Sequence, residues 1–108
     1  MKLAIGCDEA GFYLKEEVKK HLQGQGHEIE DVGVYNTDPA MYPDVAAAVA
    51  GKVLDGQAER GILICGTGIG MAMTANKFHG IRAAVCHDSF STERSVKSNN
   101  AQIMCMGA

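Results

Sequence analysis

The sequence predicts an α/β protein with a doubly wound, Rossmann-like fold in three layers, in which helices cover both faces of a five-stranded parallel sheet. Two observations predict it. Short apolar runs without polar alternation recur five times, as is typical of strands buried on both faces. Segments with helical character lie between them, and this alternation favours parallel strands joined by right-handed crossovers. We expect the strand order 2-1-3-4-5.

The first half of the chain supplies two strands and two helices. Residues 2–6 form the first apolar run, and residues 9–22 carry an apolar side chain at every fourth position from Ala10 to Leu22, which predicts an amphipathic helix. Residues 29–32 are expected to form the second strand, followed by a polar loop over 35–42. Pro43 suits the first turn of a second helix, which continues through an alanine- and valine-rich segment to about Leu54.

The second half repeats the pattern. Residues 61–65 predict the third strand, and the glycines at 66, 68 and 70 form a loop before a helix over 71–77. Residues 81–86 and 101–106 are expected to be the fourth and fifth strands, with a helix over 89–97 between them. No linker, repeat or low-complexity segment interrupts the chain, so we expect a single domain over 1–108.

Composition narrows the classes of function. The chain has 108 residues, of which 46% are hydrophobic and 21% charged, and a formal net charge of -3. Because it has no basic cluster and few aromatic residues, we expect no nucleic-acid partner. No apolar stretch approaches the roughly 20 residues that cross a bilayer, so we expect no membrane partner. Four widely spaced cysteines without a C-x-x-C pair favour free thiols, no metal site and a cytoplasmic location.

A candidate site follows from the strand ends. In doubly wound sheets, ligands bind beyond the carboxyl ends of the strands, often between the first and the third. These two strands end at Asp8 and Cys65, so we expect a carboxylate and a thiol to line one crevice. Cys65 also precedes a predicted helix, whose amino end favours a thiolate. The remaining cysteines, Cys7, Cys86 and Cys105, are expected to be small core residues.

The glycine loop over 66–70 allows an anion such as a phosphate or an enediolate to approach main-chain amides. Two different roles stay open. The loop could be a tight turn with a structural role only, or a dinucleotide site with Asp88 as a ribose contact. The dinucleotide fingerprint requires G-x-G-x-x-G in the first crossover, whereas here Met71 occupies the third-glycine position and the loop lies in the third crossover.

Longer motifs resemble a known family. The segments that carry the resemblance are 6–8, 10–12, 14–15, 31–33, 42–43, 61–70, 75–77, 80–84 and 99–101. Together they closely resemble the type B ribose-5-phosphate isomerases, a family shared with the galactose-6-phosphate isomerase subunits. The likeness covers essentially all 108 residues.

The resemblance implies an aldose–ketose isomerase without metal or cofactor, acting on a small sugar phosphate of the ribose 5-phosphate type through a cis-enediolate. It implies that Cys65 moves the proton between carbons 1 and 2, that Asp8 contacts substrate hydroxyls and that Tyr42 lines the pocket. Thr67 would assist ring opening, and Asn99 would help the loop amides to hold the enediolate oxygens. The loop residues are Gly66, Thr67, Gly68, Ile69 and Gly70. The site would be built across a homodimer or a higher homo-oligomer.

Three departures from the family pattern qualify this expectation. Glu9 stands where the family usually has histidine, and a carboxylate there would repel a phosphate unless it faces a hydroxyl or a cation. Ser98 stands where the family usually has the histidine that opens the sugar ring. The family also continues past the position of Ala108 with a helix carrying phosphate-binding arginines, so the domain could lack that helix and leave part of the sheet uncovered.

The second departure suggests a shorter substrate. A tetrose 4-phosphate has its carbon 4 oxygen esterified and cannot close to a furanose, so a ring-opening acid would be dispensable. A tetrulose phosphate is therefore an alternative to ribulose 5-phosphate. His87, at the end of the fourth strand, could instead replace the missing acid. The same residues are also compatible with a non-catalytic anion-binding module or a flavodoxin-like cofactor protein.

Overall fold

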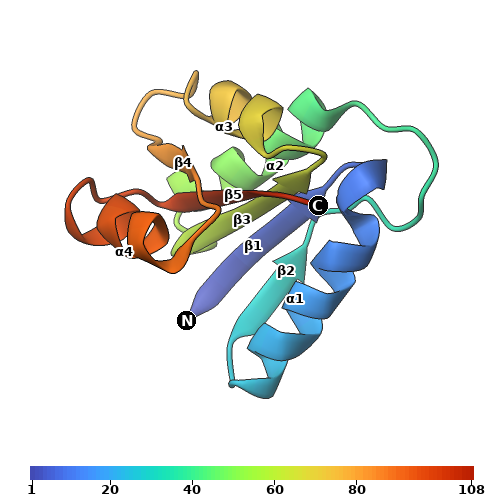
Figure 1. Cartoon of the computed structure of the whole chain (residues 1–108), viewed down its shortest axis with the longest axis horizontal. Helices are drawn as coiled ribbons and strands as arrows, with labels where there is room; N and C mark the ends of the chain where they lie inside the picture. Colours follow the sequence, from blue (N-terminus) through green and yellow to red (C-terminus); the bar gives the residue numbers. More distant parts are fainter.

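A computed structural model describes residues 1–108 as one parallel sheet with helices on both faces (Figure 1). The strands are β1 (Lys2–Cys7), β2 (Glu28–Asp31), β3 (Arg60–Cys65), β4 (Ala83–Val85) and β5 (Ile103–Gly107). The helices are α1 (Phe12–Gly24), α2 (Tyr42–Leu54), α3 (Ile69–Ala75) and α4 (Ser89–Lys97), and a 3-10 turn, η1 (Glu9–Gly11), precedes α1. The predicted α/β class with a five-stranded parallel sheet is confirmed.

The strand order is β2-β1-β3-β5-β4, so the expected order holds for the first three strands and is reversed for the last two. β5 lies between β3 and β4, and its Ile103 and Cys105 are almost completely buried. β4 has only three residues, all half-buried, and pairs with β5 alone. The strand with the larger apolar side chains therefore takes the interior, because an interior strand is covered on both faces and both edges.

Two helices begin at other residues than the sequence predicts. Asp8 accepts a hydrogen bond from the Gly11 amide at 3.1 Å and caps η1, so the regular helix α1 starts at Phe12 and not at residue 9. Gly11 lies against β3, where a Cβ would come within 2.7 Å of the Ile64 carbonyl oxygen. α3 starts at Ile69, two residues before the predicted position, which makes Gly70 part of its first turn.

The larger core lies between the sheet and the pair α2 and α3. α2 approaches the sheet closely because two sheet residues have no side chain. A Cβ at Gly6 would come 2.5 Å from a methyl of Val45, and one at Gly61 would come 2.5 Å from a methyl of Val49. This close packing fixes the start of α2 above the carboxyl ends of β1 and β3.

The opposite face is covered less completely. Figure 1 shows α1 and α4 far apart on this face, with β1, β3 and β5 visible between them. The hollow beside α1 has a volume of about 470 Å³. Its apolar lining residues are Leu3, Val18, Leu22, Ile62, Met104 and Met106. Part of this sheet face is thus not covered by a helix of the chain. None of the helices has the length and apolar character needed to span a bilayer.

Candidate active site

The carboxyl ends of β1 and β3 lie side by side. Cys7 stands opposite Ile64 in the parallel ladder, and the Asp8 amide donates to the Ile64 carbonyl oxygen at 3.1 Å. Because neighbouring strands are about 4.8 Å apart, the next residues along each strand, Asp8 and Cys65, also lie close together. The strand order reverses its direction between β1 and β3, and doubly wound sheets bind ligands at such a switch point.

Cys65 faces the glycine loop that follows β3. Its Sγ accepts a hydrogen bond from the Gly68 amide at 3.1 Å, and only 6% of the residue is exposed. Gly68 has φ of 79°, and a Cβ there would lie 2.9 Å from the Met106 carbonyl carbon, so the turn requires glycine. Gly66 and Thr67 are exposed, and their amides donate no hydrogen bond within the chain. The loop thus brings a thiol next to free main-chain donors.

The same loop continues into α3, where Tyr42 lies against it. A Cβ added to Gly70 would come 2.7 Å from Cε1 of the Tyr42 ring, so the ring rests directly on the glycine. Tyr42 is 39% exposed, while Met71 just beyond is fully buried in the core. Thr67 Oγ1 accepts from the Ile69 amide at 3.1 Å. The geometry therefore unites four expected positions, Cys65, Thr67, Gly70 and Tyr42, around one loop.

Glu9 lies in η1 beside Asp8, but its carboxylate is engaged with the main chain. Its Oε2 accepts a hydrogen bond from the Ala40 amide at 3.1 Å. Ala40 belongs to the long connection between β2 and α2, two residues before Tyr42. Glu9, which the sequence places among the substrate contacts, thus has a partner within the chain.

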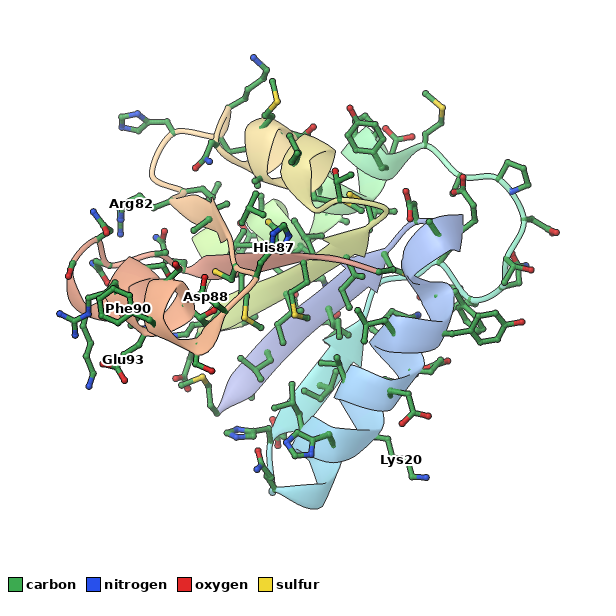
Figure 2. The ribbon with its side chains drawn as sticks, viewed as in Figure 1. Lys20, Arg82, His87, Asp88, Phe90 and Glu93 are labelled. Carbon is green, nitrogen blue, oxygen red and sulfur yellow. The ribbon has the colours of Figure 1, made fainter.

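His87 extends the site toward β4. Its Nε2 lies 3.3 Å from the carbonyl oxygen of Thr67, and because a carbonyl can only accept, this contact places the proton on Nε2. Figure 2 shows His87 turned toward the centre of the sheet, whereas Phe90 and Glu93 point outward from α4. Asp88 caps α4 by accepting from the Ser91 amide at 2.7 Å, and the bonds from Ser91 lower the pKa of Asp88. This capping occupies the carboxylate that a dinucleotide site would assign to a ribose.

Ser98 and Asn99 lie at the opposite edge of the sheet. They follow α4, which runs back from the carboxyl edge and leads into the start of β5. There the Ala101 carbonyl oxygen accepts from Arg60, the first residue of β3, at 2.6 Å. Cys65 is the last residue of the same strand, so at about 3.3 Å per residue the two edges are about 16 Å apart. One copy of the chain does not bring Asn99 to Cys65.

The other thiols are buried core groups, as predicted. Burial, together with smaller contributions from nearby Cys86 and Cys65, raises the pKa of Cys105 to about 12. Burial also raises the pKa of Cys7, although Lys15 partly offsets this effect. No group of three or more histidine, cysteine, aspartate or glutamate side chains is placed to hold a metal ion.

An ion pair that the sequence analysis missed lies at the β2 end of the connection between β2 and α2. Lys15 is fully buried, and its Nζ donates to both carboxylate oxygens of Asp31 at 2.8 Å. It also donates to the Val34 carbonyl oxygen and lies 5.2 Å from the centre of the Tyr35 ring. A lysine in an amphipathic helix normally faces solvent, so only the proximity of β2 reveals this role.

These features define a doubly wound α/β protein with a cysteine beside a glycine loop at the point where the strand order of its sheet reverses. The family model described as Ribose/Galactose Isomerase matches residues 3–108, and the chain belongs to this family. It is an aldose–ketose isomerase of sugar phosphates, and thus an intramolecular oxidoreductase.

Individual relatives agree in both sequence and structure. The chain is 55% identical over 108 residues to "Ribose-5-P isomerase B" of Listeria innocua, covering 100% of this chain and 73% of the relative. It is 52% identical to "D-erythrulose-4-phosphate isomerase 2" of Mycolicibacterium smegmatis, covering 99% of this chain and 72% of the relative. The solved structure of Clostridium thermocellum ribose-5-phosphate isomerase B superposes with a TM-score of 0.98 at 43% identity, over 99% of this chain and 72% of that one.

Proposed function

We propose that the chain interconverts a small aldose phosphate, of the ribose 5-phosphate type, and its ketose phosphate, with Cys65 as the acid–base residue. The observation that carries this proposal is the hydrogen bond from the Gly68 amide to Cys65 Sγ within a loop whose Gly66 and Thr67 amides are free. A proton-transfer group and donors for an oxyanion thus share one turn of chain. General acid–base catalysis and oxyanion stabilisation need this combination.

In the proposed step, the Cys65 thiolate takes the proton from carbon 2 of the aldose. The electron pair of that C–H bond forms the carbon–carbon double bond, and the carbonyl electrons move to the oxygen at carbon 1, giving a cis-enediolate. The amides of Gly66 and Thr67 hold the negative oxygen. The hydroxyl proton at carbon 2 passes to the oxygen at carbon 1, and the electrons of the carbon–carbon double bond take the proton back from the thiol at carbon 1. Carbon 2 thereby becomes the carbonyl of the ketose, the thiolate is regenerated, and no external oxidant or reductant is needed.

The neighbouring side chains have supporting roles in this proposal. Asp8 contacts substrate hydroxyls through the carboxylate oxygen that does not cap η1. Thr67 assists ring opening, and Tyr42 forms a wall of the pocket above Gly70. Because all four thiols of the chain are buried and free, a reducing cytoplasm suits the protein.

Asn99 is proposed to act in the site of a second copy of the chain. It is exposed at the edge of the sheet opposite to Cys65 and is too far away to act in its own chain. A symmetric homodimer, or a higher homo-oligomer, would bring the Asn99 of one copy to the Cys65 of another.

Mixing two inactive variants tests this arrangement. Chains with Cys65→Ser and chains with Asn99→Ala are expected to be inactive separately. After unfolding and refolding together at equal amounts, half of the dimers should be mixed and contain one intact site, giving about a quarter of the original activity. No recovery in a sample shown to contain mixed dimers would contradict a shared site.

A tetrulose 4-phosphate is the second candidate substrate. Two observations favour it: Ser98 replaces the ring-opening histidine of the family pattern, and the Mycolicibacterium smegmatis relative is named for erythrulose 4-phosphate. A tetrose 4-phosphate has no free hydroxyl at carbon 4, so it cannot close to a furanose ring. His87 remains the candidate acid if the substrate is a pentose, because its ring lies beside Thr67.

The test is a parallel assay of ribose 5-phosphate and erythrose 4-phosphate with the same preparation, following formation of each ketose. Turnover of either substrate, abolished by Cys65→Ser, supports the isomerase proposal. Turnover of ribose 5-phosphate alone would end the tetrose proposal, and turnover of erythrose 4-phosphate alone would end the pentose proposal. Activity that survives Cys65→Ser would remove the proposed mechanism.

A further inference from the structure

The connection from residue 32 to residue 41 contains no helix or strand, yet it delivers Tyr42 to the active-site loop. Its first part is held by the buried ion pair of Lys15 and Asp31. Asp31 also accepts from the Gly33 amide at 2.9 Å, and the Tyr35 hydroxyl donates to the Asp31 carbonyl oxygen at 3.0 Å. Lys15 lies over the Tyr35 ring as well. The segment up to residue 35 is therefore fixed to α1 and β2.

The last part, residues 36–41, has far fewer attachments. The Asp38 amide donates to Asn36 Oδ1 at 2.9 Å, and Met41 accepts from the Asp44 amide, and both of these bonds are local. The one hydrogen bond that joins this part to a different element is that from the Ala40 amide to Glu9 Oε2, at 3.1 Å. Glu9 thus ties the segment to the carboxyl end of β1.

The packing of α2 on the sheet holds the helix as a whole, and the attachment to Glu9 lies only two residues before Tyr42. Ala40 is followed by Met41, which is the N-cap of α2, and then by Tyr42, whose ring rests on Gly70. The N-cap makes no side-chain hydrogen bond, so the start of α2 has no cap of its own. A displacement of Ala40 would be passed over two peptide units to the Tyr42 ring.

We propose that Glu9 is a positioning residue that sets the wall of the substrate pocket through Ala40 and Tyr42, and that it does not itself contact the substrate. This inference rests on the proposed function for its kinetic consequence, while the attachment itself is a property of the free protein. The carboxylate is held within the chain by a main-chain donor, which explains how an acidic residue is accommodated beside a site for an anionic substrate.

The experiment compares Glu9→Ala and Glu9→Gln with the unmodified chain. The glutamine amide oxygen can still accept from Ala40, whereas alanine cannot. Glu17→Ala is the matched control, because Glu17 is an exposed carboxylate on α1 that makes no hydrogen bond or ion pair. Three quantities are measured for each protein: hydrogen exchange of the segment 36–42, the thermal midpoint, and KM and kcat for erythrose 4-phosphate and ribose 5-phosphate.

We expect Glu9→Ala to accelerate exchange of the Ala40 amide by up to about tenfold, the factor that corresponds to one net hydrogen bond. KM should rise severalfold with a smaller change in kcat, and Glu9→Gln should restore both exchange and KM to within about twofold of the original. Glu17→Ala should match the unmodified chain in all three measurements.

Two results would overturn the proposal. The first is unchanged exchange at Ala40 in Glu9→Ala together with reduced activity, which would mean that Glu9 acts on the substrate directly. The second is a Glu9→Gln variant as impaired as Glu9→Ala, which would mean that the negative charge matters and not the hydrogen bond. If none of the proteins converts either sugar phosphate, the isomerase proposal fails. The hydrogen exchange of the Ala40 amide still shows whether Glu9 holds this segment.

Discussion

The Gly68 amide donates a hydrogen bond to the sulfur of Cys65 across a three-residue turn, at 3.1 Å. The contact requires the chain to turn back on itself immediately after β3, which the positive φ of Gly68 allows. Cys65 is at the same time a member of the larger core, so the sulfur lies at the boundary between that core and the loop.

Cys65→Ser is expected to reduce kcat by about 10³-fold, because the serine hydroxyl is a far weaker base near neutral pH and acid–base groups contribute about 10² to 10⁴. The free energy of unfolding should change little, since the substitution removes no methylene. Cys7→Ala is the control, because Cys7 is fully buried on the other face of the sheet. Steady-state kinetics on both variants check this, and equal losses in the two would contradict a specific role of Cys65.

Gly68→Ala is expected to lower the free energy of unfolding by about 1 to 3 kcal/mol, as strained left-handed backbone typically does, and to abolish the bond to Cys65 Sγ. The new methyl group would also meet the main chain of Met106 at 2.9 Å. Gly66→Ala is the matched control for stability, since a Cβ there meets nothing within 4 Å. Chemical denaturation of both variants provides the measurement, and equal stabilities would disprove the strained turn.

Gly70→Ala is expected to raise KM severalfold while leaving the fold intact. The added methyl would come 2.7 Å from the Tyr42 ring, which is partly exposed and can swing away at little cost. Alanine also favours a helix over glycine by about 1 kcal/mol, which offsets the loss of contact. In a Tyr42→Ala background, the same substitution should have no further effect on KM. If Gly70→Ala raises KM by the same factor in the Tyr42→Ala background as in the unmodified chain, the two residues act independently and the prediction is wrong.

The ion pair of Lys15 and Asp31 is expected to be a large determinant of stability. Asp31→Ala would leave the fully buried ammonium of Lys15 without its partner, and such losses cost about 3 to 5 kcal/mol. Replacing both residues, as in Lys15→Met with Asp31→Ala, should recover much of this loss because no buried charge remains. Urea denaturation of the single and double variants checks the prediction, and a double variant as unstable as the single would refute it.

Acid should weaken the same pair. Burial alone would raise the pKa of Asp31, but the hydrogen bonds from Lys15, Lys19 and the Gly33 amide outweigh it and hold the pKa below the ordinary value of 3.8. A lowered pKa in the folded state gives stability that is present above the ordinary value and lost as the pH falls through the lowered one. The difference in unfolding free energy between the chain and Asp31→Asn should therefore shrink below about pH 4. A difference that stays constant down to pH 2 would contradict this coupling.

Much of the site could be predicted from the amino-acid sequence, because it is formed by residues that are close together in that sequence. The end of a buried strand, the glycines at 66, 68 and 70 and the following helix are neighbours in sequence, so their association in one loop is fixed by chain connectivity. The proximity of Asp8 to Cys65 followed from a general rule about where parallel strands reverse their order. The motifs along the chain then indicated the family, which the family model matches.

The other relationships depend on contacts between distant segments. Glu9 and Ala40 are 31 residues apart, and Lys15 and Asp31 are 16 apart, and neither pair has a periodic signal. The exchange of β4 and β5 escaped prediction for a similar reason, because a right-handed crossover can place a strand next to its predecessor or one position further.

The sequence by itself determined the alternation of elements, the class of the fold, the thiol and the loop beside it, because hydrophobic periodicity and glycine geometry are local properties of the chain. Only the tertiary structure decided that β4 lies at the edge of the sheet, that the Glu9 carboxylate accepts a hydrogen bond from the Ala40 amide and that Lys15 is buried. It also decided that Asn99 and Cys65 lie at opposite edges of the sheet. Those outcomes depend on packing between segments, and packing energy is shared among residues that the sequence order does not bring together.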